Sequence, residues 1–294
     1  MKEYKLCMLS VLFFIGQNVL SQSSTEKISK TYSFEKKNDQ NAILVFNING
    51  DVTVEGIQGD RVIVEVTKTI TAKTNDRLHL GKEEIQLGVK DLADSLIFYV
   101  VNPEQEFGNW SNKWSDDKSY GYHSSRHFSK TSLYDYKMDF IIKVPQGTHI
   151  HASTINDGEV EVKNTSKEVE ANNINGSISL QNISGTTHAK TINGNVDIVY
   201  ANNPTTDCNY YSLNGHINLL FKSSVNALIT FKSFNGSLYT NVDQLSSMPS
   251  LVSKTENQKG TKYKIENERF KLGSGGPTLN VETFNGNAYL KENK

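Results

Sequence analysis

A short unit dominates the hydrophobic pattern of this chain and repeats along its second half. An apolar residue precedes Asn-Gly, and apolar residues fill the second and fourth positions after the glycine, as with Gly176, Ile178 and Leu180. This alternation has the period of a β-strand, whose successive side chains point to opposite faces. The pattern therefore predicts short strands on both sides of an Asn-Gly corner. The corner positions are Asn49, Gly50, Asn175, Gly176, Asn193, Gly194, Asn214, Gly215, Asn235, Gly236, Asn285 and Gly286.

The spacing of the corner glycines leaves two architectures to compare. Gly158, Gly176 and Gly194 follow one another at 18 residues, Gly215 and Gly236 follow at 21, and another 50 residues separate Gly236 from Gly286. Asn-Gly between alternating strands is typical of a tight hairpin, which would give an antiparallel meander. A β-solenoid instead repeats the same corner in every coil. The apolar and asparagine columns recur in register, so they favour an all-β solenoid with coils of 18–21 residues.

Each residue type of the unit has a physical reason in a solenoid. Glycine adopts a positive φ without a steric clash, and asparagine tolerates left-handed geometry. Stacked asparagine side chains can hydrogen-bond from coil to coil, as amide ladders do. We expect the core to contain the residue two positions before each glycine and the residues two and four positions after it. The first of these columns is Ile48, Ile174, Ile192, Leu213, Phe234 and Phe284.

The first 21 residues have the pattern of a signal peptide. Lys2 and Lys5 precede an apolar run over residues 6–16, and Val19 and Ser21 fit the small residues of a cleavage site. A transmembrane anchor is the alternative, but the run is short against the roughly 20 residues that span a bilayer. We therefore expect an exported chain with no integral membrane span after cleavage.

The rest of the chain divides into three regions. Residues 22–40 form a polar lead-in, with a strand near 30–36. Residues 41–145 form an N-terminal β region, with one short helix near 75–81 for which Asn75 is the expected N-cap. Residues 146–294 carry the solenoid repeats, interrupted by an irregular insertion at 243–277, after which the unit at Gly286 forms the last rung.

The N-terminal β region contains an aromatic insertion at residues 103–135. A connection of this length is usually functional or disordered. Aromatic faces suit sugar rings and partner surfaces, so Trp110, Trp114, Tyr120 and Tyr122 are the candidate ligand-binding residues. The alternative is an excursion that folds over the side or end of the solenoid.

Composition narrows the chemistry further. The hydrophobic content of 36% suits a thin β architecture better than one thick core, and the formal charge of −1 disfavours nucleic-acid binding. Cys208 is the one cysteine beyond the signal region, which excludes an internal disulfide and favours a buried or loop thiol. No nucleotide-binding or catalytic motif is present. We therefore expect no cofactor and assign no catalytic residue.

Two histidine pairs were considered as metal ligands. His149 and His151 alternate along one strand and would share a face, and His123 and His127 lie in the aromatic insertion. Neither pair has a third ligand at suitable spacing, so we expect exposed histidines and no metal site. Glu159 and Glu161 are interpreted in the same way, as a solvated face and not as a catalytic pair.

Several segments together resemble a known family. The order NINGDVTVEGIQGDRVIVEVTK, DFIIKVPQGTHIHASTINDGEVEV and GGPTLNVETFNGNAYL resembles the bacterial putative-adhesin family of β-strand-repeat proteins, a domain of unknown function. The resemblance covers about residues 41–102 and 136–294. The chain is also similar in style to head GIN auto-transporter adhesin domains, although it lacks their literal Gly-Ile-Asn signature. The resemblance implies a right-handed parallel β-helix in an exported or envelope location, and it implies no catalytic residues.

Three functions follow from these observations. The first is a non-enzymatic envelope protein whose surface serves adhesion, assembly or scaffolding, with an envelope or extracellular protein or glycan as partner. The second is a carbohydrate-binding module that uses the aromatic insertion. The third is a polysaccharide-active enzyme, which would require acidic residues converging in a groove.

Overall fold

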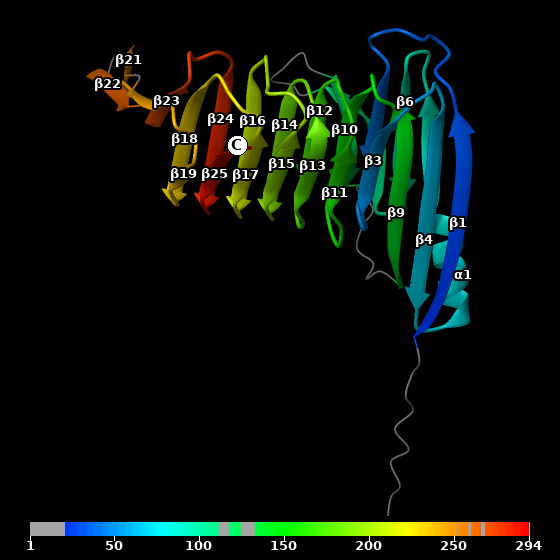
Figure 1. The fold of residues 1–294 in the computed structure, drawn as a ribbon. Helices are drawn as coiled ribbons and strands as arrows, with labels where there is room; N and C mark the ends of the chain where they lie inside the picture. Colours follow the sequence, from blue (N-terminus) through cyan, green and yellow to red (C-terminus); the bar gives the residue numbers. More distant parts are fainter. Residues whose placement is uncertain are drawn as a thin grey trace, which may run out of the picture.

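The computed structural model describes residues 21–111, 118–124, 133–250, 252–257, 260–265 and 268–293. Its described part is all-β with one helix, as the alternation predicts. Two large sheets run along the molecule, accompanied by two separate two-stranded hairpins (Figure 1). The predicted signal peptide, apart from Ser21, lies outside the described residues.

The spatial order of the strands in the ten-stranded sheet is β1 (Gln22–Tyr32), β4 (Val62–Ala72), β9 (Tyr134–Pro145), β3 (Val52–Ile57), β11 (Val160–Lys163), β13 (Ile178–Ile183), β15 (Val196–Tyr200), β17 (Ile217–Phe221), β25 (Ala288–Glu292) and β19 (Leu238–Thr240). The order in the eleven-stranded sheet is β20 (Leu245–Met248), β23 (Glu268–Leu272), β18 (Ala227–Asn235), β24 (Thr278–Asn285), β16 (Cys208–Asn214), β14 (Thr187–Asn193), β12 (Val169–Asn173), β10 (His149–Thr154), β2 (Ala42–Phe46), β6 (Ser95–Val101) and β5 (Gln86–Asp91). The remaining elements are the hairpins β7 (Gln105–Ser111) with β8 (Lys118–Ser124) and β21 (Val252–Asn257) with β22 (Gly260–Ile265), and the helix α1 (Asn75–Glu84).

The chain passes from one large sheet to the other at each Asn-Gly corner. At the corner of Asn175 and Gly176, β12 ends in the eleven-stranded sheet and β13 begins in the ten-stranded sheet. β12 pairs in parallel with β14, and β13 pairs in parallel with β15. The antiparallel meander is therefore wrong, because the strands that flank a corner belong to different sheets. We call two such strands and their corner a rung.

The spatial order of the rungs differs from their order in the sequence. β24 lies between β16 and β18, and β25 lies between β17 and β19, so the rung of residues 278–292 is inside the stack (Figure 1). The prediction that this segment is the last rung is wrong in space. The rung β18/β19, which precedes it in the chain, occupies the end of the stack instead.

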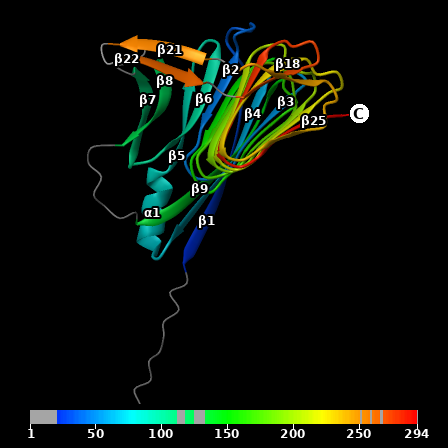
Figure 2. The same cartoon turned by 90° about the vertical axis from the view of Figure 1, so that its left-hand side faces the viewer.

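The residues that follow each corner fill the space between the sheets. Val196 and Ile198, two and four positions after Gly194, are at most 1% exposed. The corresponding residues of the other rungs are equally buried up to the end of the stack, where Leu238 and Thr240 are only half-buried. The predicted core column after the corner is therefore confirmed. Viewed along the stack, the rungs superimpose around this narrow core (Figure 2).

Glycine is needed at most corners for space and not for a positive φ. Gly50 has a φ of 119°, but Gly176, Gly194, Gly215 and Gly236 are not among the residues with positive φ. A Cβ added to Gly194 would lie 2.2 Å from the carbonyl oxygen of Gly176 on the neighbouring rung. The expectation of left-handed geometry is therefore wrong at these four positions. Glycine is needed there because neighbouring corners approach too closely for any side chain.

The corner asparagines form a ladder of side-chain hydrogen bonds along the stack. Asn193 Nδ2 donates to Asn175 Oδ1 at 2.8 Å, and Asn214 Nδ2 donates to Asn193 Oδ1 at 2.9 Å. Asn156 takes the ladder position in the unit with the extra residue Asp157, whose φ is 53°. The other ladder bonds join Asn156 to Asn49 at 3.3 Å, Asn175 to Asn156 at 2.9 Å, Asn285 to Asn214 at 2.8 Å and Asn235 to Asn285 at 3.0 Å.

A second column, three positions before the corner glycine, is polar and buried. Thr191 Oγ1 donates to the carbonyl oxygen of Gly176 at 2.8 Å, and Ser212 Oγ donates to that of Gly194 at 2.8 Å. A buried carbonyl oxygen without a donor is costly, so these side chains satisfy the corner backbone. The equivalent donors are Thr154 to Gly50 and Thr283 to Gly215, and the amide of Asn173 to Gly158.

Replacing Thr191 with valine should lower the free energy of unfolding by about 1–2 kcal/mol, because the shape is kept while the Gly176 carbonyl oxygen loses its donor. Thermal and urea unfolding followed by circular dichroism would measure the change. Thr53→Val is the matched control, since Thr53 is half-buried on the outer side of β3 and should tolerate the substitution. An equal loss in both variants would contradict a role for the buried hydroxyl.

The N-terminal region extends the ten-stranded sheet with longer strands. β9 pairs in parallel with β3 and antiparallel with β4, whose other edge pairs with β1. The lead-in is therefore a strand from Gln22 to Tyr32, so the predicted strand near residues 30–36 is misplaced, because polar residues suit an edge strand. Lys68 of β4 is buried, and its Nζ donates to the carbonyl oxygens of Lys82 and Ile85 at 3.2 and 3.1 Å at the end of α1. The cap of α1 is Thr74, not Asn75, and the helix continues to Glu84.

Candidate interaction surface

The apolar column two positions before each corner glycine lies on the outside of the stack. Ile174 is 39% exposed, Phe284 is 43% exposed and Phe234 is 72% exposed, whereas Ile48 at the N-terminal side is buried. The prediction that this column points inward is wrong, because the corner changes which residues of the alternation face the core. We define the apolar stripe as Ile155, Ile174, Ile192, Leu213, Phe284 and Phe234, in spatial order, where Ile155 precedes the corner that has the extra residue Asp157. Ile155, Ile192 and Leu213 are half-buried, and Ile155 packs against the core.

The fold does not require apolar residues at the exposed positions of the apolar stripe, Ile174, Phe284 and Phe234. A side chain that is two-fifths exposed gains little from burial, so a polar residue would fit the same position. Neighbouring rungs are about 4.8 Å apart, which places successive members of the stripe side by side. Single exposed apolar residues are ordinary, but contiguous exposed apolar patches mark interaction sites. The stripe is therefore the strongest candidate for a binding surface in the described chain.

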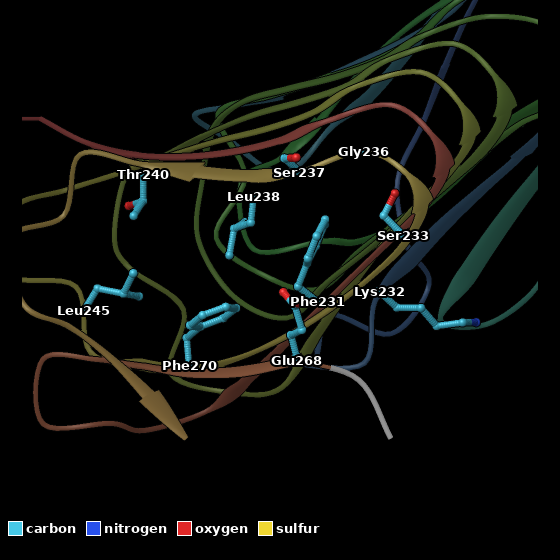
Figure 3. A pocket seen from close by; sticks show the side chains of 10 residues that line it. All are labelled: Phe231, Lys232, Ser233, Gly236, Ser237, Leu238, Thr240, Leu245, Glu268 and Phe270. Atoms are coloured by element: carbon cyan, nitrogen blue, oxygen red, sulfur yellow. The ribbon is translucent and has the colours of Figure 1, made fainter. Parts of the chain in front are cut away.

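The apolar stripe ends in two stacked aromatic rings beside the open end of the core. The rings of Phe234 and Phe284 are 4.8 Å apart between centroids and nearly parallel, at 5°. In the adjacent cavity of about 460 Å³, Phe231, Leu238 and Phe270 point toward one another (Figure 3). β19 ends the ten-stranded sheet, so no strand of the described chain pairs with its outer edge. Phe234, which is 72% exposed, is the most exposed large apolar side chain among the described residues and lies at this end.

The outer face beside the stripe carries charges that are engaged with one another. His151 Nδ1 lies 3.0 Å from Glu170 Oε2, and Lys190 Nζ lies 5.6 Å from the ring centre of Tyr211. Lys232 forms an ion pair with Glu282 across neighbouring rungs. The hydrogen bond from His151, aided by its charge and by the Asn172 amide, lowers the pKa of Glu170 to about 2 against the cost of its partial burial. The face is therefore an ordered array of polar groups.

The lowered pKa of Glu170 predicts a dependence of stability on pH. A carboxyl group whose pKa is lowered by folding stabilises the native state above its unfolded pKa of about 4.5, and this contribution disappears as the pH falls through about 2. Glu170→Gln should therefore lower the free energy of unfolding at pH 5 by at most about 1 kcal/mol, since the group is half-exposed, and by less at pH 2. Urea titrations at both values would measure this. Glu159→Gln, on an exposed residue, should show no such difference, and a constant effect of Glu170→Gln would contradict the assignment.

The aromatic insertion forms the hairpin of β7 and β8 at the side of the stack (Figure 2). Phe107 stacks on Tyr99 at 4.2 Å between ring centroids and lies 5.9 Å from the ring of Tyr120. The hydroxyl of Tyr122 donates to the Phe46 carbonyl oxygen at 2.9 Å and accepts the Val100 amide at 2.7 Å. These contacts hold the hairpin against the outer face of the eleven-stranded sheet.

The four candidate ligand-binding residues are not brought into one described site. Tyr122 is used to attach the hairpin, and burial raises its pKa. Tyr120 is half-buried beside Phe107, with Lys90 Nζ 5.2 Å from its ring centre. The backbone of Trp110 belongs to β7, but its side chain and the whole of Trp114 lie outside the described residues.

The histidines and the cysteine show no catalytic arrangement where they are described. His149 Nδ1 lies 3.6 Å from Glu168, parallel to the pair of His151 with Glu170. No group of three or more potential metal ligands occurs among the described residues. Cys208 is buried, and this burial raises the pKa of its thiol. His127 lies outside the described residues. None of the helices in this same part of the chain is long and apolar enough to cross a membrane.

Comparison with known proteins gives only distant similarities. No protein-family model and no curated protein matches the chain. Among solved structures, a putative cell adhesion protein from Clostridium sporogenes has a TM-score of 0.37 at 10% identity, covering 91% of this chain and 100% of that one. A putative adhesin from Bacteroides fragilis has a TM-score of 0.34 at 13% identity, covering 91% and 97%. One from Parabacteroides merdae has a TM-score of 0.28 at 12% identity, covering 93% and 97%. At these TM-scores the similarities carry no argument about fold or function.

Proposed function

We propose that this chain is an exported, non-enzymatic β-solenoid protein of a bacterial cell envelope, which acts as an adhesin or scaffold by binding a partner macromolecule along the apolar stripe. The stripe carries the proposal, because six successive rungs present an apolar side chain beside the corner, and three of these side chains, Ile174, Phe284 and Phe234, are exposed. Its most exposed members are Phe284 and Phe234.

The parallel pairing of successive rungs supports a β-solenoid architecture. Strands of successive rungs pair in parallel and in register, as β11, β13 and β15 do in one sheet and β12, β14 and β16 do in the other. We propose that this arrangement is a right-handed parallel β-helix. The asparagine ladder and the closely stacked glycines are the devices that hold neighbouring coils in register. A rigid stack of this kind suits the display of an extended surface.

The non-enzymatic part of the proposal is supported by how the polar groups are used. On the outer face His151 pairs with Glu170 and Lys232 pairs with Glu282, so these charges neutralise one another. Glu161 is likewise engaged, with Lys163 Nζ at 2.6 Å. Catalysis by acids and bases needs groups held ready for a substrate. The array of satisfied pairs supports binding by shape and apolar contact instead.

Export is tested by locating the chain in the producing bacterium. The basic and apolar pattern of residues 1–21 predicts cleavage after Ser21, so mass spectrometry of the purified protein should find Gln22 as the first residue. Cell fractionation should recover this form from the envelope or the medium, and a cytoplasmic enzyme serves as the control. A chain that keeps residues 1–21 and fractionates with the cytoplasm would contradict the proposal.

Carbohydrate binding is the second candidate for the same exported protein. The observation that favours it is the stack of Tyr99, Phe107 and Tyr120 under Lys90, next to the backbone of Trp110. Aromatic faces of this kind suit sugar rings. Glycan binding by Trp110, Trp114, Tyr120 and Tyr122 stays a prediction, and a polysaccharide-active enzyme is the least favoured alternative.

A further inference from the structure

The rung of residues 278–292 is inserted between two rungs that precede it in the sequence. Its strand β24 pairs with β16 on one side and β18 on the other, and β25 pairs with β17 and β19. We call residues 278–292 the inserted rung, and the space between β16/β17 and β18/β19 the slot. The inserted rung thus has neighbours on both sides, like a rung in the middle of the stack.

The connection that crosses the slot is no longer than a connection between two adjacent rungs. Residues 222–226 join β17 to β18 across it, whereas a connection of the same length, residues 164–168, joins β11 to β12 on adjacent rungs. The interval from Gly215 to Gly236 is 21 residues, as is the interval from Gly194 to Gly215. The sequence therefore fits two arrangements: the slot filled by the inserted rung, and β18/β19 stacked directly on β16/β17.

The slot holds the inserted rung by the same corner contacts that join all rungs. Asn285 hydrogen-bonds to Asn214 at 2.8 Å and to Asn235 at 3.0 Å, and Thr283 Oγ1 donates to the Gly215 carbonyl oxygen at 3.3 Å. Phe284 stacks on Phe234. The asparagine ladder is therefore continuous through the inserted rung, and the buried donor is present toward β16, whereas Ser233 Oγ on the β18 side has no hydrogen-bond partner.

Further contacts make the slot selective for this segment. Asn280 Nδ2 donates to Asn209 Oδ1 at 2.8 Å, and Asn280 Oδ1 accepts Thr230 Oγ1 at 2.5 Å. Glu282 pairs with Lys232 on the far side of the slot. Glu292 Oε1 accepts the amide of Val225, in the connection that crosses the slot, at 3.0 Å. Both walls of the slot and the connection thus recognise side chains of residues 278–292.

We infer that the slot is a binding site for residues 278–292 as a separable segment, filled in this structure by the chain's own copy and able to take the same segment from a second copy. Exchange of an identical element keeps every contact, so it costs little once the segment is released. Residues 241–277 connect β19 to the inserted rung. They include β23, which pairs with β18, and β20, which pairs with β23, so these two strands must also be released before the segment reaches a second copy. The occupant is thus a second copy of this chain, and the product is a strand-exchanged oligomer. This inference does not depend on the partner of the apolar stripe.

The test uses the full chain and a biotin-labelled synthetic peptide of residues 277–293. After incubation with excess peptide, size-exclusion chromatography should show saturable binding of one peptide per chain. The control peptide carries Gly286→Ala, because a Cβ at Gly286 would lie 2.0 Å from the Gly215 carbonyl oxygen. The control peptide should bind at least about 30-fold more weakly than the unchanged peptide.

Hydrogen exchange of the full chain gives a second, independent measurement. Backbone amides of residues 278–292 should exchange faster than those of β14 and β15, although both lie inside the stack, because the inserted rung can leave the slot locally. Equal protection of the two rungs overturns the inference. It is also overturned if neither peptide binds, or if both bind equally well.

Discussion

Replacing Gly194 with alanine should lower the free energy of unfolding by about 2–3 kcal/mol. The added Cβ would lie 2.2 Å from the Gly176 carbonyl oxygen, 2.5 Å from its carbonyl carbon and 2.8 Å from the Ser177 nitrogen. All three atoms are backbone, so the two rungs must separate locally. This separation also weakens the asparagine ladder on both sides of Asn193. Circular dichroism during heating should show a fall in Tm of about 5–10 °C.

Gly147→Ala is the matched control for this substitution. Gly147 lies in the turn after β9, has no positive φ, and an added Cβ there meets no atom within 4 Å. It should therefore leave Tm almost unchanged, or raise it slightly by restricting the unfolded chain. Similar losses in both variants would mean that the corner glycines do not act through close contact between rungs.

Much of the strand pattern could be predicted from the sequence because it depends on local alternation. Residues two and four positions after each glycine have the period of a strand and are buried in every rung but the end rung β18/β19, as Val196 and Ile198 illustrate. The asparagines could be placed at a common corner because their register along the sequence is regular. A local pattern of this kind is visible in one chain without any knowledge of its neighbours.

Which residues before each corner face the core could not be predicted, because this depends on the geometry of the corner. The pattern predicts apolar Ile174 in the core, yet Ile174 is exposed and the polar Asn173 before it is buried. The reversal follows from the corner carbonyl of the neighbouring rung, which needs a buried donor, as Asn173 Nδ2 provides to Gly158 at 3.0 Å. The signal is present in the sequence as a Thr, Ser or Asn three positions before the glycine, or four positions before Gly158, whose unit has the extra residue Asp157.

The spatial order of the rungs could not be predicted from the sequence either. The distance of 50 residues between Gly236 and Gly286 indicates an insertion, but it does not say on which side of β18/β19 the chain returns. The intervals are equally compatible with both arrangements. Contacts between residues far apart in the chain decide the outcome, such as the pairing of Tyr210 with Val281.

Replacing Phe234 and Phe284 together with serine should remove most of the binding attributed to the apolar stripe while leaving the fold intact. Both rings are exposed and stack on each other, so they contribute little to the core. We expect a stability loss of about 1 kcal/mol or less, in line with an exposed aromatic pair. Aromatic anchors at a partner surface contribute far more, and their loss should weaken binding by about 30-fold or more.

A second aromatic pair, in which Tyr239 is 51% exposed and Tyr289 is half-buried, supplies the control. Tyr239 and Tyr289 stack at 5.2 Å between ring centroids on the outer side of the ten-stranded sheet, away from the stripe. Serine at both positions changes the surface by a similar amount. Circular dichroism should confirm that both double variants fold.

The most direct test of the apolar stripe is attachment of the producing bacterium to protein-coated and glycan-coated surfaces, together with cell–cell aggregation. Four strains would be compared, carrying the unchanged chain, Phe234→Ser/Phe284→Ser, Tyr239→Ser/Tyr289→Ser, or a deletion of the gene. We predict that the phenylalanine variant attaches and aggregates as poorly as the deletion strain, while the tyrosine variant behaves like the unchanged strain. Attachment and aggregation that are equal in all four strains, or lost equally in the two double variants, would contradict the stripe as the binding surface.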